Sequence, residues 1–154
     1  MIYGAYAKTD YAGCGGDGLT NYNGAIIRRS CKPPVTFAMV TDGLSNTLVV
    51  GEKQTNPKNF GGSGGDNEPW VNNGWDQDHI RIGSLADYPQ SDREHPSEAP
   101  PASTYWSNRF GSSHDGVFHG VMGDGSVRPI SYNIDSEVFR RVCVRNDGLT
   151  ISEW

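Results

Sequence analysis

Apolar residues form their clearest patterns in two parts of the chain, around residue 50 and between residues 116 and 148. Residues 47–52 are a short apolar run, rich in β-branched residues and bounded by turn signals, which is typical of a strand. Because the run does not alternate with polar residues, it predicts a central strand buried on both faces. Residues 35–40 are β-branched and aromatic as well, and predict either a short strand or a turn of helix.

A β-hairpin is predicted in the C-terminal part of the chain. Residues 116–122 and 126–131 are two β-prone runs on either side of Asp124-Gly125. An Asp-Gly pair between two such runs is the strongest short-range hairpin signal, and it predicts a type I′ turn. Both central residues of that turn have positive φ angles, so the turn residues are part of the prediction.

A short amphipathic helix is predicted after the hairpin. Asp135 is the predicted N-cap, and Glu137 suits the first turn because it lies near the positive end of the helix dipole. One face of the helix is apolar and comprises Val138, Phe139, Val142 and Cys143. Gly148 follows and is predicted to stop the helix in the left-handed conformation.

The periodicity fades between residues 54 and 112, where glycines, prolines and isolated aromatic residues replace it. A loop-rich stretch of this length inside a small domain is usually functional or packs over a sheet. We therefore predict one α+β domain over residues 1–154. Its antiparallel sheet contains the 47–53 strand and the 116–131 hairpin, a short C-terminal helix packs on it, and a long aromatic loop region covers one side.

The composition limits both the core and the class of function. Leu, Ile, Val and Phe account for only 29 of the 154 residues, so the four Trp and seven Tyr must fill the core or lie on a surface that uses them. With 13 basic against 18 acidic residues, the chain is not expected to bind nucleic acid. No apolar run approaches about 18 residues, so no membrane span is predicted, and the first residues do not form a signal peptide pattern.

Four motifs, in order along the chain, carry a resemblance to a known family. His114 and Asp124-Gly125 are separated by nine residues, which makes an H-x9-DG pattern. Upstream lie residues 10–13 (DYAG) and 41–53 (TDGLSNTLVVGEK), and downstream lies the predicted helix with its RNDG end at 145–148. Together these motifs resemble the DUF1559 family of planctomycete type, whose members carry a prepilin-type processing-associated H-x9-DG domain.

The resemblance implies a pseudopilin-like protein that is exported and lies outside the cell or at its surface. Family members usually begin with a class III leader and a long apolar helix, so we expect a pseudopilin-like globular head that lacks the N-terminal helix. Exported chains favour disulfides, and Cys14 and Cys31 lie in Gly-rich and Pro-flanked loops, so this pair is predicted to be bridged. Cys143 is expected to be a small buried hydrophobe.

An aromatic group in the long loop region predicts a ligand-binding surface. It comprises Trp70, Trp75, Tyr105 and Trp106. Aromatic rings take the apolar face of a sugar ring, while short polar side chains such as Asp76 hold its hydroxyls. The alternative is that these rings pin the loop onto a core that is poor in leucine.

The acidic residues of the same region allow two further hypotheses. Asp76 and Asp78, with Glu68 nearby, offer hard oxygen ligands and predict a Ca²⁺ site, although they lack the EF-hand pattern. Glu52, Glu68, Asp76 or Asp78 could also supply the two carboxyl groups of a glycoside hydrolase. The alternatives are a solvated turn and, for Glu52, a structural ion pair with Lys53.

His114, Asp124 and Gly125 are interpreted first as a structural motif, in which Asp124-Gly125 makes the turn and His114 braces the start of the strand. The functional alternative joins His114 to Asp115 and His119 as a ligand or acid/base set. Because His114 and His119 are five residues apart, they would point to opposite faces of one strand, which argues against a shared metal site.

The favoured hypothesis is thus a non-catalytic, extracellular module that works through its surfaces. Its expected partners are polysaccharides or other cell-surface proteins, and Ca²⁺ is the one cofactor that the sequence suggests. The alternatives are a carbohydrate-binding module and a glycoside hydrolase that acts on polysaccharide through a Trp-lined surface.

Overall fold

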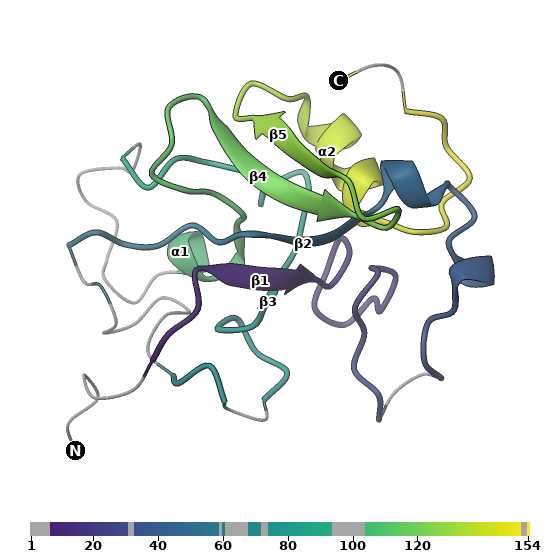
Figure 1. Cartoon of the computed structure of the whole chain (residues 1–154), viewed down its shortest axis with the longest axis horizontal. Helices are drawn as coiled ribbons and strands as arrows, with labels where there is room; N and C mark the ends of the chain where they lie inside the picture. Colours follow the sequence, from purple (N-terminus) through teal and green to yellow (C-terminus); the bar gives the residue numbers. More distant parts are fainter. Residues whose placement is uncertain are drawn as a thin grey trace.

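A computed structural model of the protein describes residues 7–30, 33–58, 60, 68–71, 74–93, 104–151 and 154. These residues form a mixed sheet with the strand order β3-β1-β2-β4-β5 (Figure 1). The strands are β1 (Tyr11–Cys14), β2 (Leu48–Glu52), β3 (Ile80–Arg81), β4 (Val117–Met122) and β5 (Val127–Ser131). The helices are α1 (Thr104–Asn108), α2 (Ser136–Cys143) and two 3₁₀ turns, η2 (Phe37–Met39) and η3 (Leu44–Asn46). The predicted α+β class is confirmed.

β2 occupies the centre of the sheet, antiparallel to β1 and β4, as predicted for a central strand. It is not buried on both faces, because Leu48 is fully buried while Val49 and Val50 are half-buried. A register shift between Leu48 and Val50 interrupts the alternation. Because of this shift, buried and half-buried residues follow one another along the strand without strict alternation. A continuous apolar run therefore occurs even though only one face of the strand is buried. β3 adds a short parallel pairing to β1, so the sheet is mixed rather than purely antiparallel.

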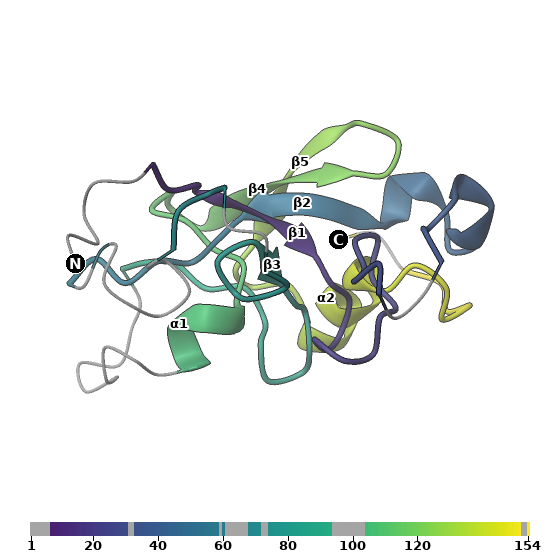
Figure 2. The ribbon, with the colours of Figure 1, turned by 90° about the horizontal axis from the view of Figure 1, so that it is seen from below.

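Both α-helices lie on the same side of the sheet (Figure 2). The core lies between this face and α2, and its largest buried side chains include Leu48, Phe110, Phe118 and Phe139. Gly51 leaves room for the aromatic rings, because a Cβ at this position would lie 2.8 Å from Phe110. No described helix is both long and apolar enough to cross a membrane.

The predicted hairpin between β4 and β5 is present, but its turn differs from the predicted type I′. The amide of Gly125 donates to the carbonyl of Met122, and the amide of Met122 donates to the carbonyl of Ser126. Gly125 has φ +84°, whereas Asp124 is not among the described residues with positive φ. This is the pattern of a three-residue loop with one left-handed residue. The Asp124 carboxylate accepts hydrogen bonds from Ser126 and fixes the turn from the side.

α2 begins as predicted, because the Asp135 carboxylate accepts hydrogen bonds from the amides of Glu137 and Val138. It ends at Cys143, earlier than predicted, since Val144 is already extended. Gly148 does have a positive φ of 72°, but it belongs to a separate turn after the helix. The reason for that turn is a contact with a distant part of the chain.

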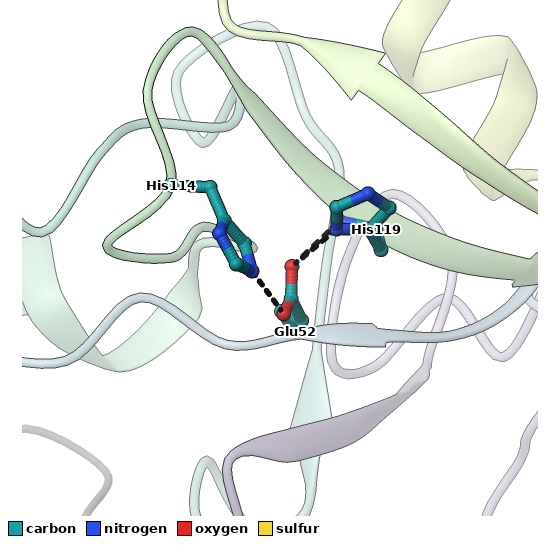
Figure 3. A group of neighbouring side chains, drawn as sticks. All are labelled: Glu52, His114 and His119. Carbon is teal, nitrogen blue, oxygen red and sulfur yellow. Dashed lines mark hydrogen bonds and ion pairs between the residues drawn. The ribbon is translucent and has the colours of Figure 1, made fainter.

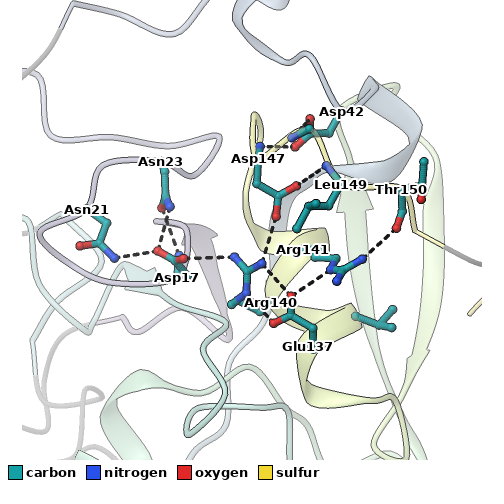
Figure 4. Close-up of polar contacts among 12 residues, drawn as sticks. Asp17, Asn21, Asn23, Asp42, Glu137, Arg140, Arg141, Asp147, Leu149 and Thr150 are labelled. Atoms are coloured by element: carbon teal, nitrogen blue, oxygen red, sulfur yellow. Dashed lines mark hydrogen bonds and ion pairs between the residues drawn. The ribbon is translucent and has the colours of Figure 1, made fainter.

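Asp42 makes this contact and anchors what we call the C-terminal clamp (Asp17, Asp42, Glu137, Arg140 and Asp147). Its carboxylate accepts hydrogen bonds from the amides of Asp147 at 2.7 Å and Gly148 at 2.9 Å. Arg140 meets the carboxylates of Asp17, Glu137 and Asp147 (Figure 4). The clamp therefore joins the N-terminal loop, the segment before β2 and the end of the chain.

The predicted Cys14–Cys31 disulfide is not formed, because Cys14 is a free, buried thiol. Cys31 itself lies outside the described residues. The thiol of Cys14 is directed into the core, where it contacts the carbonyl of Cys143 at 3.5 Å. Cys143 is buried as predicted, and burial raises the pKa of its thiol well above the ordinary value. Alternation along β1 explains the difference, since Cys14 occupies an inward-facing position.

Candidate functional site

Glu52 and His119 lie side by side on the sheet face that points away from α2. Gly51 of β2 pairs with Gly120 of β4, which places Glu52 next to His119 on the neighbouring strand. The amide of His119 donates to Glu52 Oε2 at 2.7 Å, and His119 Nδ1 lies 3.4 Å from the same oxygen. The register of two central strands thus positions the carboxylate and the first imidazole.

His114 reaches the same carboxylate from the loop that precedes β4. Its Nε2 lies 3.2 Å from Glu52 Oε1, and the two imidazole rings stand edge to face with centroids 5.1 Å apart. Figure 3 shows the two rings on either side of the carboxylate. We call Glu52, His114 and His119 the histidine–glutamate cluster; one donor atom of each residue lies within 4.8 Å of the others.

Hydrogen bonds hold the His114 loop in place. Ser112 Oγ accepts from the amide of His114 and lies within bonding distance of the carbonyl of Val117. The amide of Ser112 donates to the hydroxyl of Tyr132, whose proton is directed at the carbonyl of Ser112. Glycine at position 116, with φ +74°, allows the loop to turn back into β4. The position of His114 is therefore built into the fold.

A polar cavity of about 260 Å³ adjoins the cluster, with Glu52 and His114 in its wall. The rest of its lining comes from Asp10, Tyr11, Lys53, Thr55, Phe60, Asp92, Gly111, Ser112 and Ser113. Burial raises the pKa of Asp92, although hydrogen bonds from Thr55 and Ser113 oppose the shift. Residues from three of the four sequence motifs therefore meet at one cavity.

Two imidazole nitrogens and a carboxylate oxygen can hold a divalent transition metal or relay a proton. The argument against a shared site for His114 and His119 is wrong, because His114 does not belong to the strand. His114 contacts Glu52 of β2, and its structural role at the start of the strand stays a prediction. Asp115 turns instead to Arg93, 2.7 Å away at the surface. Sequence reasoning missed the connection to Glu52, although all three residues fall in or beside motifs.

A second group of possible ligands comprises Glu68, Asp76 and Asp78, with one oxygen of each within 4.8 Å of the others. Asp78 is buried and accepts a hydrogen bond from the amide of Glu68. Burial and the neighbouring carboxylates raise the pKa of Glu68. The structure thus brings Asp76 and Asp78 together, as a Ca²⁺ site requires, and the Ca²⁺ site itself stays a prediction.

The aromatic group of the sequence is divided by the fold. Trp70 is 58% exposed, whereas Trp106 is only 1% exposed and belongs to the core, so it drops out of any surface platform. Trp75 packs against Tyr22 and donates its indole N–H to the carbonyl of Leu19. Arg109 covers the ring of Tyr105 at 4.4 Å. Trp106 thus fits the alternative in which the aromatic rings pack the long loop onto the core. Of the four aromatic residues, Trp70 alone has a largely exposed ring.

An apolar cavity of about 420 Å³ lies near the hairpin turn. Phe37, Val40, Leu44, Val121 and Gly125 contribute to its wall. Phe37 is 76% exposed, and Val127, the cross-strand partner of Val121, is 65% exposed. We call Phe37, Val121 and Val127 the apolar patch.

These features define a small α+β protein. Its motif residues line a polar surface cavity and form part of the C-terminal clamp. The family model described as "Protein of unknown function (DUF1559)" matches residues 3–137. The chain therefore belongs to the DUF1559 family, as its motifs indicated. No curated protein and no solved structure matches the chain.

Proposed function

We propose that this protein is an extracellular, pseudopilin-like interaction module that works without catalysis and binds another cell-surface protein. The apolar patch is the observation that carries the proposal. Phe37 is largely exposed and lines an apolar cavity, and the exposed Val127 pairs across the hairpin with Val121, which lines the same cavity. Soluble domains seldom expose such groups together unless a partner covers them.

The contacts of the motif residues support a scaffold role for several of the sequence motifs. Asp42 binds the backbone of the C-terminal end, and Gly125 closes the hairpin. Both are structural tasks, and neither needs a substrate. A rigid frame that presents exposed surface is what an interaction module requires.

The test places a photo-crosslinking amino acid at Phe37 in the protein produced from its native gene in its own cells. We expect a discrete adduct with one surface protein, and protease added to intact cells should degrade the module. Leu85, which is 59% exposed elsewhere, is the control position. Equal adducts from both positions, or full protection from protease, would refute the proposal.

Carbohydrate binding is the second candidate, and the open ring of Trp70 favours it. The backbone carbonyl of Trp70 contacts His79 Nε2 at 3.0 Å, which places the residue beside a polar side chain. A polysaccharide pull-down with the native chain and with Trp70→Ala tests this candidate, and Leu85→Ala serves as the control. Retention that is equal for all three chains removes Trp70 from any sugar site.

The glycoside hydrolase alternative has less support. Three carboxylates converge at Glu68, Asp76 and Asp78, with one oxygen of each within 4.8 Å of the others, whereas glycoside hydrolases use two carboxyl groups that flank the scissile bond, about 5–5.5 Å apart in retaining enzymes and further apart in inverting ones. The carboxylate of Glu52 contacts two imidazoles. The acidic residues are thus arranged to share a proton or a cation.

A further inference from the structure

We propose that the histidine–glutamate cluster binds a divalent transition metal of the zinc type. The cluster offers two imidazole nitrogens and a carboxylate from three positions that the fold brings together. This inference does not depend on the proposed interaction function, because the apolar patch uses other residues.

The distances within the cluster suit a metal better than they suit hydrogen bonds. Zinc–nitrogen and zinc–oxygen bonds of about 2.0–2.2 Å at tetrahedral angles place neighbouring ligand atoms about 3.4 Å apart. His114 Nε2 lies 3.2 Å from Glu52 Oε1 and His119 Nδ1 lies 3.4 Å from Glu52 Oε2, so each imidazole stands at about this spacing from one of the two carboxylate oxygens. Direct N–H···O bonds are most often about 2.9–3.0 Å long, so both contacts are long for hydrogen bonds.

The identity of the donors selects the class of metal. Imidazole nitrogen prefers zinc, copper, nickel and iron, whereas Ca²⁺ and Mg²⁺ prefer sites made of oxygen. His114 presents Nε2 and His119 presents Nδ1 to the shared carboxylate. Glu68, Asp76 and Asp78 of the same protein offer oxygen atoms alone, which is the kind of ligand set that Ca²⁺ prefers.

The surroundings of the cluster fix the ligands and leave room for a further one. The amide of His119 holds Glu52 Oε2, and Ser112 holds the backbone of His114. Such outer contacts orient metal ligands and raise affinity. The side chains of His114 and His119 are 56% and 42% exposed, so a metal bound by three protein atoms would keep an open position for water.

The test titrates Zn²⁺ into the tag-free, chelator-treated protein at about pH 7.5, where imidazoles are mostly neutral. Isothermal titration calorimetry should report one site per chain. Glu52→Gln keeps the size of the side chain, and His114→Gln and His119→Asn replace the imidazole with a neutral polar side chain. Each substitution should weaken binding more than about 10-fold. Excess Ca²⁺ should leave the zinc affinity unchanged.

His79→Gln is the matched control, because His79 lies beside the acidic group, 3.6 Å from Asp76. It should bind zinc like the native chain. An independent measurement follows the imidazole nitrogens by NMR, where Nε2 of His114 and Nδ1 of His119 should shift together with zinc. Circular dichroism confirms that each variant folds.

The proposal is overturned if the native chain fails to bind Zn²⁺ at about 1 mM, a ligand concentration that still reveals a weak site. It is also overturned if the three substitutions leave the affinity unchanged, if His79→Gln alone abolishes binding, or if Ca²⁺ competes with zinc for the site.

Discussion

The C-terminal clamp and the histidine–glutamate cluster both join residues that lie far apart in the sequence, but they differ in how fully their polar atoms are paired. In the clamp, each Asp42 oxygen accepts a backbone amide at 2.7–2.9 Å. In the cluster, Glu52 meets its two imidazoles at 3.2–3.4 Å, and the rings are half-exposed.

This difference separates stability from function. Short, charge-assisted hydrogen bonds with defined partners hold a chain together, and removing one partner leaves the other without compensation. Exposed imidazoles with long contacts contribute little to folding, and they leave donor atoms accessible to a ligand. The clamp is therefore expected to respond to substitution through stability, and the cluster through binding.

The largest loss of stability is expected for Asp42→Ala. The substitution removes two charge-assisted hydrogen bonds and frees the turn at Asp147 and Gly148. We expect the free energy of unfolding to fall by about 2–4 kcal/mol. Urea denaturation followed by circular dichroism measures the change.

Asp115→Ala is the matched control for this prediction. Asp115 is likewise an aspartate with a polar partner, Arg93, but its side chain is 92% exposed, so its loss should change stability by less than about 0.5 kcal/mol. Similar losses for Asp42→Ala and Asp115→Ala would contradict the role assigned to the clamp.

A smaller loss of stability is expected for Gly125→Ala. This substitution changes the DG part of the H-x9-DG pattern and leaves His114 in place. Gly125 has φ +84°, and an added Cβ meets no atom within 4 Å, so the cost is conformational alone. We expect about 1–2 kcal/mol from the left-handed backbone. Gly125→Asn should lose less, because asparagine tolerates this conformation, and thermal melting of the two variants makes the comparison.

Local signals predicted the elements that depend on neighbouring residues. The cap at Asp135 and the hairpin around Gly125 need only contacts within a few residues, and both are present. The clamp and the parallel pairing of β3 join segments that are far apart in the sequence. No periodicity encodes such pairings, because they depend on how the whole chain packs.

The site was partly predictable for the same reason. His114 and His119 were recognised as candidates, yet their spacing suggested opposite directions because both were assumed to lie on one strand. The turn at Gly116 removes that assumption. Glu52 joins them only through the β2–β4 register, which the sequence does not state. Trp106 shows the converse, since a ring suited to a ligand was needed by the core.

Acid should weaken the clamp by a smaller, graded amount. Hydrogen bonds from Arg140 and then Arg141 lower the pKa of Glu137 from 4.5 to about 2. Burial alone would raise the pKa of Asp17, but hydrogen bonds from Asn21 and Asn23 and the charge of Arg140 lower it. Lowered pKa values mean that the ionised groups stabilise the fold above about pH 4.5 and lose that effect toward about pH 2.

Thermal melting across this pH range measures the effect. Glu137→Gln should melt at a temperature that depends less on pH than that of the native chain. Asp92 titrates in the opposite sense, since its raised pKa favours the folded state as the pH falls. Asp92→Asn should therefore make the acid loss steeper. A slope that is unchanged by Glu137→Gln would contradict the pairing with Arg140.

The smallest effect on stability is expected for His114→Gln measured with a chelator present. The imidazole is 56% exposed and its contact with the Glu52 carboxylate is 3.2 Å long, so the free energy of unfolding should change by less than about 0.5 kcal/mol. Adding zinc should then distinguish the native chain from the variant, because a ligand that binds only the folded state raises stability by an amount that grows with the logarithm of its concentration over Kd. The native chain should gain stability with zinc and the variant should not. If His114→Gln instead lost much stability in the presence of the chelator, the cluster would stabilise the fold as the C-terminal clamp does. The contrast between the two regions would then not hold.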